Sequence, residues 1–280
     1  MNKSTEKPIV IYHANCADGF GAAWVFHHLN PNEFIFHPGV YGEVPPKEIL
    51  GRDVYLVDFS YKLPVVRKMV EVTRSITLID HHKSSIEDLK ELIENKSINS
   101  FTDVTQSGAM LAWKFFHPIE EPPKLLKYIE DRDLWKFSLP GSADVNAALF
   151  SYPYDFTVWD ALMQHDIQEL KKEGEHINRK HFKDIRELLS IVTRTMRIDG
   201  HTVPVANLPY VYSSDAGHIL AKDQPFAACY WDTPTGRVFS LRSAETGMDV
   251  QEIAVKFGGG GHPHAAGFTL SFEDARKLEV

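Results

Sequence analysis

The chain has 280 residues, a net charge of −8 with histidine neutral, and 43% hydrophobic residues. This length can bury a large core and predicts one large or two modest domains. The acidic balance argues against a protein that coats long duplex DNA, which needs a basic surface, but it is compatible with a short oligonucleotide held in a local pocket.

The two cysteines, Cys16 and Cys229, do not form a disulfide framework and fit a reducing cytoplasm. The apolar run at residues 9–12 is interrupted at His13, so it is too short for a signal peptide. No segment approaches the roughly 18 apolar residues of a membrane span. We therefore expect a cytoplasmic protein that does not cross a membrane.

The first half of the chain alternates short apolar strands with helices. Strands are predicted at residues 9–12, 53–57 and 75–79, and helices at 19–29, 63–72 and 85–94. Nearly all-apolar strands between helices indicate a parallel sheet that is covered on both faces. Ligands of such sheets bind beyond the carboxyl ends of the strands.

The second half begins with mainly helical sequence and then changes character. A long charged amphipathic helix is predicted at 166–197, followed by strands at 203–206, 226–231, 238–242 and 265–270 and a helix at 249–257. We predict an α/β protein with a parallel-sheet N-terminal domain at 1–165 and a smaller α/β domain at 200–280. A long linker helix at 166–199 joins the two.

Acidic and imidazole side chains follow each of the three N-terminal strands. They are His13 and Asp18 after the first strand, Asp58 after the second, and Asp80, His81 and His82 after the third. If the strands are neighbours, the carboxylates meet at one edge and repel one another unless a cation binds. Aspartate oxygens with histidine nitrogens suit Mn²⁺, and two ions would activate a water and neutralise a phosphoryl group. Taken singly, Asp58 is also explained as a helix N-cap, and either histidine of the pair as an ordinary half-buried residue.

These motifs resemble those of the DHH phosphoesterases. Asp80-His81-His82 carries the name motif after an apolar strand, and His13 with Asp18 matches the opening metal motif. Asp58 matches the aspartate expected after the second strand. The family has a further metal-binding aspartate after a helical segment.

Two aspartates, Asp131 and Asp133, match that further position. The resemblance favours Asp131, and Asp133 is equally explained as a solvated turn charge.

The resemblance implies two metal ions, with Mn²⁺ expected and Mg²⁺ or Co²⁺ as substitutes. It places His13 and Asp18 at the first ion, shares Asp58 and Asp80 between the ions, and places His82 and Asp131 at the second. It implies catalytic roles for Asp80, His81 and His82, with His81 facing the substrate or supporting the ligands.

The chain departs from the family pattern at Cys16, where many members have an aspartate. A thiolate ligand, which favours softer ions than Mn²⁺, and a small packing residue both stay open here.

The stretch from Gly258 to Gly267 resembles the glycine-rich signature of the DHH-associated C-terminal domain. By that resemblance, the substrate-binding residues are Gly259, Gly260, Gly261, His262, His264 and, on the preceding strand, Arg242. Successive glycines let a backbone approach a ligand closely, and their N–H groups can form an anion-binding nest. Read alone, the run is a flexible loop and the arginine a surface residue.

The resemblance as a whole, from His13 to Gly267, implies a metal-dependent phosphodiesterase similar to the nanoRNases. Its substrates would be short oligoribonucleotides or linear dinucleotides, such as those from cyclic dinucleotide breakdown, cleaved to mononucleotides. The alternatives are a nucleoside bisphosphate phosphatase or pyrophosphatase, and a non-catalytic nucleotide sensor. The expected partner is a short RNA or dinucleotide, without long duplex DNA or a membrane, and a homodimer stays open.

Overall fold

The computed structural model describes residues 6–278. The chain divides into two compact units, Met1–Asn178 and Arg179–Val280. The first holds a parallel sheet and the second a mixed sheet, so the predicted α/β fold class is confirmed.

The sheet of the first unit has five parallel strands in the order β2-β1-β3-β4-β5. Their bounds are β1 (Ile9–His13), β2 (Ile35–Gly39), β3 (Asp53–Val57), β4 (Ser75–Asp80) and β5 (Asn99–Thr102). The three predicted strands are the central ones. The two edge strands were not predicted, because β2 contains a proline and β5 is mostly polar, so neither has an apolar pattern.

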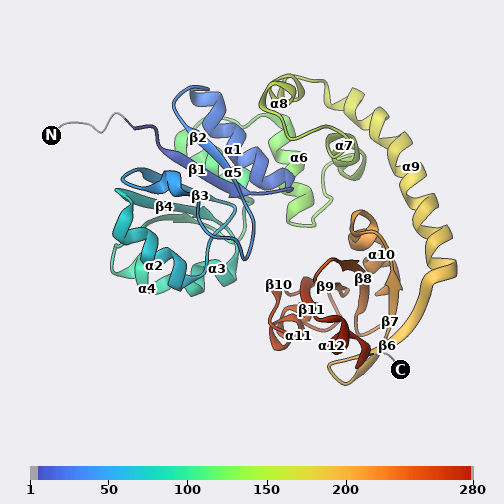
Figure 1. Cartoon of the computed structure of the whole chain (residues 1–280). Helices are drawn as coiled ribbons and strands as arrows, with labels where there is room; N and C mark the ends of the chain where they lie inside the picture. Colours follow the sequence, from blue (N-terminus) through green and yellow to red (C-terminus); the bar gives the residue numbers. More distant parts are fainter. Residues whose placement is uncertain (1–5, 279–280) are drawn as a thin grey trace. The chain divides into compact units, whose positions relative to one another are not determined.

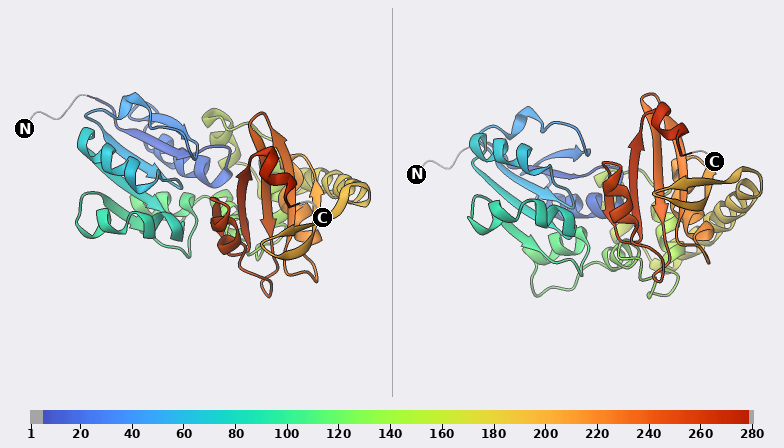
Figure 2. Two further views of the ribbon diagram at one scale, coloured as in Figure 1. Left: turned by 60° about the horizontal axis from the view of Figure 1, so that its bottom comes forward. Right: turned by 90° about the horizontal axis from the view of Figure 1, so that it is seen from below.

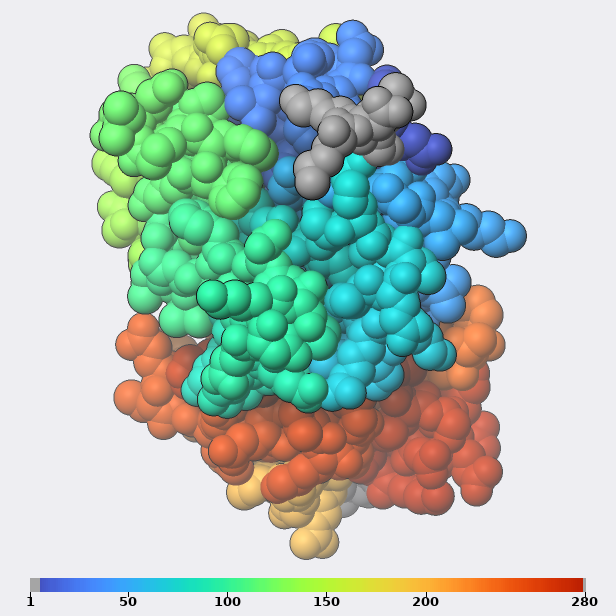
Figure 3. Space-filling view, turned by 90° about the vertical axis from the view of Figure 1, so that its left-hand side faces the viewer, coloured from blue at the N-terminus to red at the C-terminus, as the bar shows by residue number. Residues whose placement is uncertain are grey.

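Helices cover both faces of this sheet (Figures 1 and 2). On one side lie α1 (Ala17–Leu29), α5 (Gly108–Phe116), α6 (Lys124–Asp133), α7 (Ser142–Leu149) and α8 (Phe156–Met163). On the other lie α2 (Leu63–Val72), α3 (Lys83–Asp88) and α4 (Lys90–Glu94), preceded by a short 3₁₀ turn, η1 (Lys47–Ile49). In the space-filling view, α2 to α4 form a continuous part of the surface of this unit (Figure 3).

Alternate strand residues supply two separate apolar cores. Val10 and Val57 pack in the core under α1 and α5, whereas Ile11 and Leu56 pack in the core under α2. Successive side chains of a strand point to opposite faces, so burial on both faces requires an uninterrupted apolar strand.

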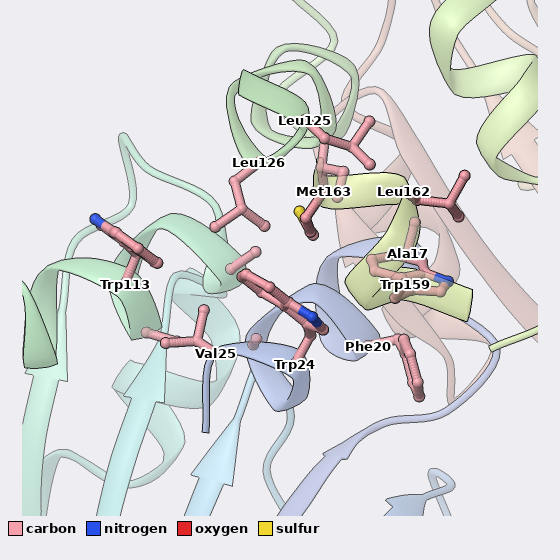
Figure 4. Packing of buried hydrophobic residues seen from close by; sticks show 14 of the residues in the cluster. Ala17, Phe20, Trp24, Val25, Trp113, Leu125, Leu126, Trp159, Leu162 and Met163 are labelled. Atoms are coloured by element: carbon pink, nitrogen blue, oxygen red, sulfur yellow. The ribbon is translucent and has the colours of Figure 1, made fainter. Parts of the chain in front are cut away.

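The larger core fixes the start of α1, which carries candidate metal ligands. Trp24 of α1, Leu126 of α6 and Trp159 of α8 meet in it (Figure 4). Both tryptophans are almost fully buried, and Trp24 Nε1 donates to Asp160 Oδ1 at 2.8 Å. Burying side chains of this size contributes much of the packing free energy of the unit.

The second unit contains a six-stranded sheet in the order β10-β11-β9-β8-β7-β6, antiparallel except for the β7–β8 pair. Its strands are β6 (Thr193–Ile198), β7 (His201–Asn207), β8 (Ala227–Thr233), β9 (Gly236–Arg242), β10 (Gly260–His262) and β11 (Ala265–Leu270). Its helical segments are η2 (Tyr210–Tyr212), α10 (Ser213–Leu220), α11 (Val250–Lys256) and α12 (Phe272–Arg276). The side chains of α11 and α12 pack on one face of the sheet, and α10 packs on the other.

The long helix α9 (Ile167–Val192) lies within the stretch predicted as helical, 166–199, but it ends before residue 199. Thr193–Ile198 instead forms β6 and pairs with β7 across a two-residue turn, Asp199 and Gly200. Both turn residues have positive φ, 49° and 83°, as the tight turns of β-hairpins require. The charged amphipathic pattern of α9, which directly precedes Thr193, led to the prediction of a helix that continues through this strand. Within residues 6–278, no helix is both long and apolar enough to cross a bilayer.

Candidate metal centre

The register of the parallel strands places the carboxyl ends of β1, β3 and β4 side by side. Tyr12 of β1 pairs with Val57 of β3, and Val57 pairs with Ile79 of β4. The next residues along the chain are His13, Asp58 and Asp80. The expected convergence at the carboxyl edge of the sheet is therefore present in the structure.

Asp58 adopts a left-handed backbone conformation, with φ 52°. Its amide still donates to Ile79 O at 2.9 Å, so the residue leaves the strand abruptly but remains tethered to it. Non-glycine residues in this region of φ are uncommon and cluster at functional sites. The turn directs a buried carboxylate towards the histidines of the neighbouring strand end.

The Asp80 carboxylate organises the residues that follow it. Its Oδ1 accepts the backbone N–H groups of His81 and His82, at 2.7 and 3.1 Å, and lies 2.7 Å from His82 Nδ1. Its Oδ2 is buried, and no donor among residues 6–278 makes a hydrogen bond to it. A buried carboxylate oxygen without a donor is costly, and a bound cation would satisfy it.

His81 connects the remaining carboxylates. Its Nε2 lies 3.2 Å from Asp58 Oδ1, 3.5 Å from Asp133 Oδ2 and 3.8 Å from Asp18 Oδ2. His13 Nδ1 lies 3.6 Å from the other oxygen of Asp58. The contacts therefore form one continuous cluster of imidazoles and carboxylates.

Three sets of ligand atoms in this cluster lie within 4.8 Å of one another, close enough to share an ion within each set. The sets are Asp58, Asp80, His81 and His82; His13, Cys16 and Asp58; and Asp18, His81 and Asp133. Oxygen and imidazole donors predominate, which fits Mn²⁺ and related divalent ions.

The pKa values of the buried groups show how strongly the carboxylates attract positive charge. Burial disfavours the charged form of Asp58, but hydrogen bonds with His13 and His81 hold its pKa well below the usual range. Burial would lower the pKa of His81, but its bond with Asp58 outweighs this and raises it to about 10. Burial would also lower the pKa of His82, but its bond with Asp80 outweighs this and raises it to about 9. In the metal-free protein, protons bound to the imidazoles thus supply the positive charge that the carboxylates attract.

Asp18 combines two tasks. Its carboxylate accepts the N–H groups of Gly108 and Ala109, at 2.6 and 2.9 Å, at the first residues of α5. Carboxylates are favourable at helix N-termini, because orphan N–H groups and the helix dipole attract them. Burial, followed by repulsion from Asp58, nevertheless raises the pKa of Asp18 well above its usual range.

Cys16 lies beside His13 and Asp58 and is partly buried. Burial, and then the nearby Asp58, raise the pKa of its thiol well above the usual value. In the absence of metal the thiol is therefore neutral near pH 7. Both the ligand and the packing role stay open.

The structure brings Asp133, and not Asp131, to the cluster. The Asp131 Oδ1 atom accepts Ser138 N at 2.9 Å and Ser138 Oγ at 2.5 Å, and its Oδ2 accepts Leu139 N at 3.2 Å. Residues two apart on a helix point about 200° apart, so only one of these two aspartates can face the cluster. The sequence pattern did not indicate which one, because the decisive contact, Asp133 with His81, joins distant parts of the chain.

In the second unit, the glycine run closes a helix and builds a hairpin. Gly258 has φ 79°, and the amides of Gly258 and Gly259 donate to Val255 O and Ala254 O, which ends α11 in a Schellman arrangement. A Cβ atom at Gly259 would lie 2.0 Å from Gly267 O. Because the Gly259 amide is used within the fold, it is not part of an anion-binding nest.

The other predicted substrate-binding residues gather at one end of this sheet. His262 is opposite Ala265 in the β10–β11 hairpin, and Ala265 is opposite Arg242 on β9. His264 lies in the hairpin turn, with Nδ1 2.9 Å from Ser243 Oγ. Gly260 and Gly261 lie in β10, opposite Gly267 and Ala266.

The Arg242 guanidinium is oriented by polar groups of the same unit. Its Nη1 donates to Ser240 Oγ at 3.0 Å and Leu241 O at 2.8 Å, and its Nη2 donates to Ser214 Oγ at 3.3 Å. A Cβ atom at Gly217 of α10 would lie 2.8 Å from Arg242 Cγ, so this glycine makes room for the arginine stem.

Two curated proteins show sequence similarity to the chain, whereas no family model matches it. Uncharacterized protein R106 of Acanthamoeba polyphaga mimivirus is 27% identical over 290 residues, which cover 94% of this chain and 67% of R106. Oligoribonuclease NrnB of Bacillus subtilis is 23% identical over 230 residues, which cover 74% of this chain. That match covers only 56% of NrnB.

Two solved structures share the fold. A pGpG-specific phosphodiesterase, PggH, from Vibrio cholerae has a TM-score of 0.51 and 16% identity, covering 97% of this chain and 95% of its own. An exopolyphosphatase-related protein from Bacteroides fragilis has a TM-score of 0.55 and 15% identity, covering 97% and 90%.

Together these matches confirm the resemblance to the DHH phosphoesterases. Two of the similar proteins, the oligoribonuclease and the pGpG-specific phosphodiesterase, carry the names of phosphoesterases.

Proposed function

We propose that the chain is a divalent-metal-dependent phosphodiesterase that hydrolyses short oligoribonucleotides or linear dinucleotides to mononucleotides. The observation that carries this is the buried cluster of imidazoles and carboxylates, in which Asp80 Oδ2 has no hydrogen-bond donor among residues 6–278. The oligoribonuclease and the pGpG-specific phosphodiesterase among the similar proteins support the substrate class.

The proposed metal ligands are His13, Asp18, Asp58, Asp80, His82 and, in place of Asp131, Asp133. We propose Mn²⁺, with two ions, and Mg²⁺ or Co²⁺ as substitutes. Bound ions supply an acidified water near neutral pH and neutralise the phosphoryl oxygens.

The side chains contribute orientation and proton binding. Asp80 Oδ1 fixes the His82 ring through Nδ1, which sets the direction of the other ring nitrogen. His81 Nε2 lies within 3.8 Å of three carboxylates, where it can hold a proton close to the cluster. We therefore propose that His81 supports the metal ligands and faces the substrate.

For the second unit we propose binding of a substrate phosphate by Arg242, His262 and His264, with the backbone of Gly260 and Gly261. A guanidinium held by two hydroxyls and a carbonyl suits a bidentate contact with phosphate. The glycine at 259 contributes through packing, because its amide is already bonded.

We further propose a cytoplasmic protein, since two thiols and no disulfide framework fit a reducing compartment. Its partner would be the substrate alone, a short RNA or a dinucleotide. A homodimer is compatible with this proposal and is tested by light scattering.

The decisive experiment is a product time course on a panel of 5′-phosphorylated RNAs, from dinucleotides upwards, with Mn²⁺ and with excess chelator. Pyrophosphate and a nucleoside bisphosphate belong in the same panel. Dinucleotides and short RNAs are expected to be cleaved to mononucleotides only with metal. Faster turnover of the bisphosphate or pyrophosphate would replace the proposal with a phosphatase, and binding of nucleotides without any turnover would indicate a sensor.

A further inference from the structure

The loop that follows Asp133 is fixed by an aspartate that faces away from the metal cluster. Besides the bonds of its carboxylate to Ser138 and Leu139, Asp131 accepts the amides of Lys136 and Phe137 on its carbonyl, at 2.8 and 3.3 Å. Asp131 therefore holds the loop through both its side chain and its backbone, immediately after the last turn of α6. These hydrogen bonds hold the loop in one conformation.

That shape is unfavourable for the residues in it. Trp135 has φ 55° and Phe137 has φ 46°. For bulky side chains the left-handed region is a genuine outlier, and it persists only where the surrounding contacts over-determine it. Two aromatic residues separated by a single residue, both in this conformation, indicate that the direction of their rings matters.

The rings of Trp135 and Phe137 are exposed to solvent. Trp135 is 40% exposed and Phe137 is 37% exposed, although both are large and apolar. Their ring centroids lie 4.8 Å apart with planes at 83°, an edge-to-face pair that stabilises each ring. The guanidinium of Arg132 lies 5.4 Å from the centre of the Trp135 ring. Core packing does not account for this arrangement, because it leaves much of both rings in water.

The pair adjoins the metal cluster along the chain. Asp133, whose Oδ2 lies 3.5 Å from His81 Nε2, is two residues before Trp135. Two residues span at most about 7.6 Å between Cα atoms, so the side chain of Trp135 begins within one side chain's reach of a cluster ligand. In a nucleotide the base is separated from its phosphate by a single sugar ring, a comparable distance.

We infer that Trp135 and Phe137 form a stacking platform for a nucleobase of the nucleotide whose phosphate lies at the metal cluster, an inference that rests on the proposed function. Stacking on an aromatic face tolerates any base, so the platform selects nucleotides over simple phosphate esters without choosing one base. Asp131 is then a positioning residue that sets the loop, which explains the bonds of its buried carboxylate to Ser138 and Leu139.

The test compares a dinucleotide with its abasic analogue, in which hydrogen replaces each base, in the metal-loaded full-length protein. Trp135→Ala is expected to lower kcat/KM for the dinucleotide about 5- to 150-fold, the usual range for the loss of one stacked base, mainly through KM. Turnover of the abasic analogue and the metal content should not change. Trp135→Phe should retain most of the wild-type value, because it keeps an aromatic face.

Two further variants serve as controls for misfolding and for the general loss of an exposed ring. Trp135→Leu keeps apolar bulk without an aromatic face, so it should fold as the wild type does and still lose turnover of the dinucleotide alone. Phe115→Ala removes a ring with a similar exposure, 37%, near the far end of α5 from the Asp18 contact, and should leave both substrates unaffected.

Equal losses on both substrates, or wild-type constants in Trp135→Ala and Phe137→Ala, would overturn the platform. Failure of the proposed function gives a different result, because the wild type would then hydrolyse neither the dinucleotide nor its abasic analogue.

Discussion

Gly108 lies so close to Asp58 that a Cβ atom added at Gly108 would be 2.5 Å from Asp58 Cβ, and 3.0 Å from Asp18 Oδ2. The first residue of α5 is thus fitted against two of the proposed metal ligands. Because both neighbours are buried and held by hydrogen bonds, neither can move away cheaply.

Gly108→Ala is therefore expected to displace Asp58 and to lower metal content and kcat together. Alanine has the higher helix propensity, by up to about 1 kcal/mol, so propensity alone would make the variant more stable. Metal analysis and thermal unfolding, with Lys114→Ala on the exposed face of the same helix as the control, decide between the two effects. Full metal content in Gly108→Ala would show that this fit is unimportant for the centre.

The two aspartates at the end of α6 should behave differently on substitution. Asp133→Asn should reduce metal content and kcat with little change in stability, because its carboxylate contacts the cluster and not the loop. Asp131→Ala leaves the amides of Ser138 and Leu139 without their acceptor and should cost about 1–3 kcal/mol of unfolding free energy while the protein keeps its metal. Metal analysis together with chemical unfolding distinguishes the two variants. If Asp131→Ala loses metal but keeps its full stability, Asp131 is a metal ligand after all.

This pair also shows what the sequence can and cannot predict. Central strands and the convergence of His13, Asp58 and Asp80 were predictable, since uninterrupted apolar runs mark buried parallel strands and parallel strands share an edge. The orientation of α6, which decides between Asp131 and Asp133, depends on packing with distant helices. Likewise β6 and the edge strands β2 and β5 are defined by hydrogen bonds to neighbours, not by their own composition.

The stability of the metal-free protein should fall as the pH rises. His81 and His82 have folded-state pKa values of about 10 and about 9, above the ordinary value of about 6.5, because their carboxylate partners outweigh burial. A raised pKa stabilises the fold fully below the unfolded value, and this stabilisation is lost as the pH passes through the folded value. Thermal unfolding of chelator-treated protein should thus show decreasing stability from about pH 6.5 to about pH 10, with a weaker decrease in His82→Gln. A flat profile over this interval would contradict the proposed charge balance.

Substitution of Cys16 distinguishes the two roles left open for it. If Cys16 is a packing residue, Cys16→Ser should keep most activity and all of the metal. Cys16→Asp adds a carboxylate beside His13 and Asp58 and should tighten metal binding. Elemental analysis gives the answer directly, because one ion fewer per chain in Cys16→Ser would identify the sulfur as a ligand.

His262 should affect catalysis without affecting metal binding. It belongs to the hairpin of the second unit, opposite Ala265 and at the level of Arg242, whereas every ligand atom of the cluster belongs to the first unit. A hydrogen bond to a charged group contributes roughly 1.5–3 kcal/mol, so His262→Ala should lower kcat/KM about 10- to 150-fold. Part of the loss should appear in kcat, since a contact with the phosphoryl oxygens strengthens as negative charge develops on them.

The measurement is steady-state kinetics on a dinucleotide beside metal stoichiometry, with Asp80→Ala as the metal-losing reference and His165→Ala, an exposed histidine of the first unit, as the neutral control. Asp80→Ala should lose metal and kcat together, because it removes the carboxylate that holds the backbone and ring of His82. If His262→Ala loses metal in the same way, or cleaves the dinucleotide with wild-type constants, the assignment of phosphate binding to this hairpin is wrong.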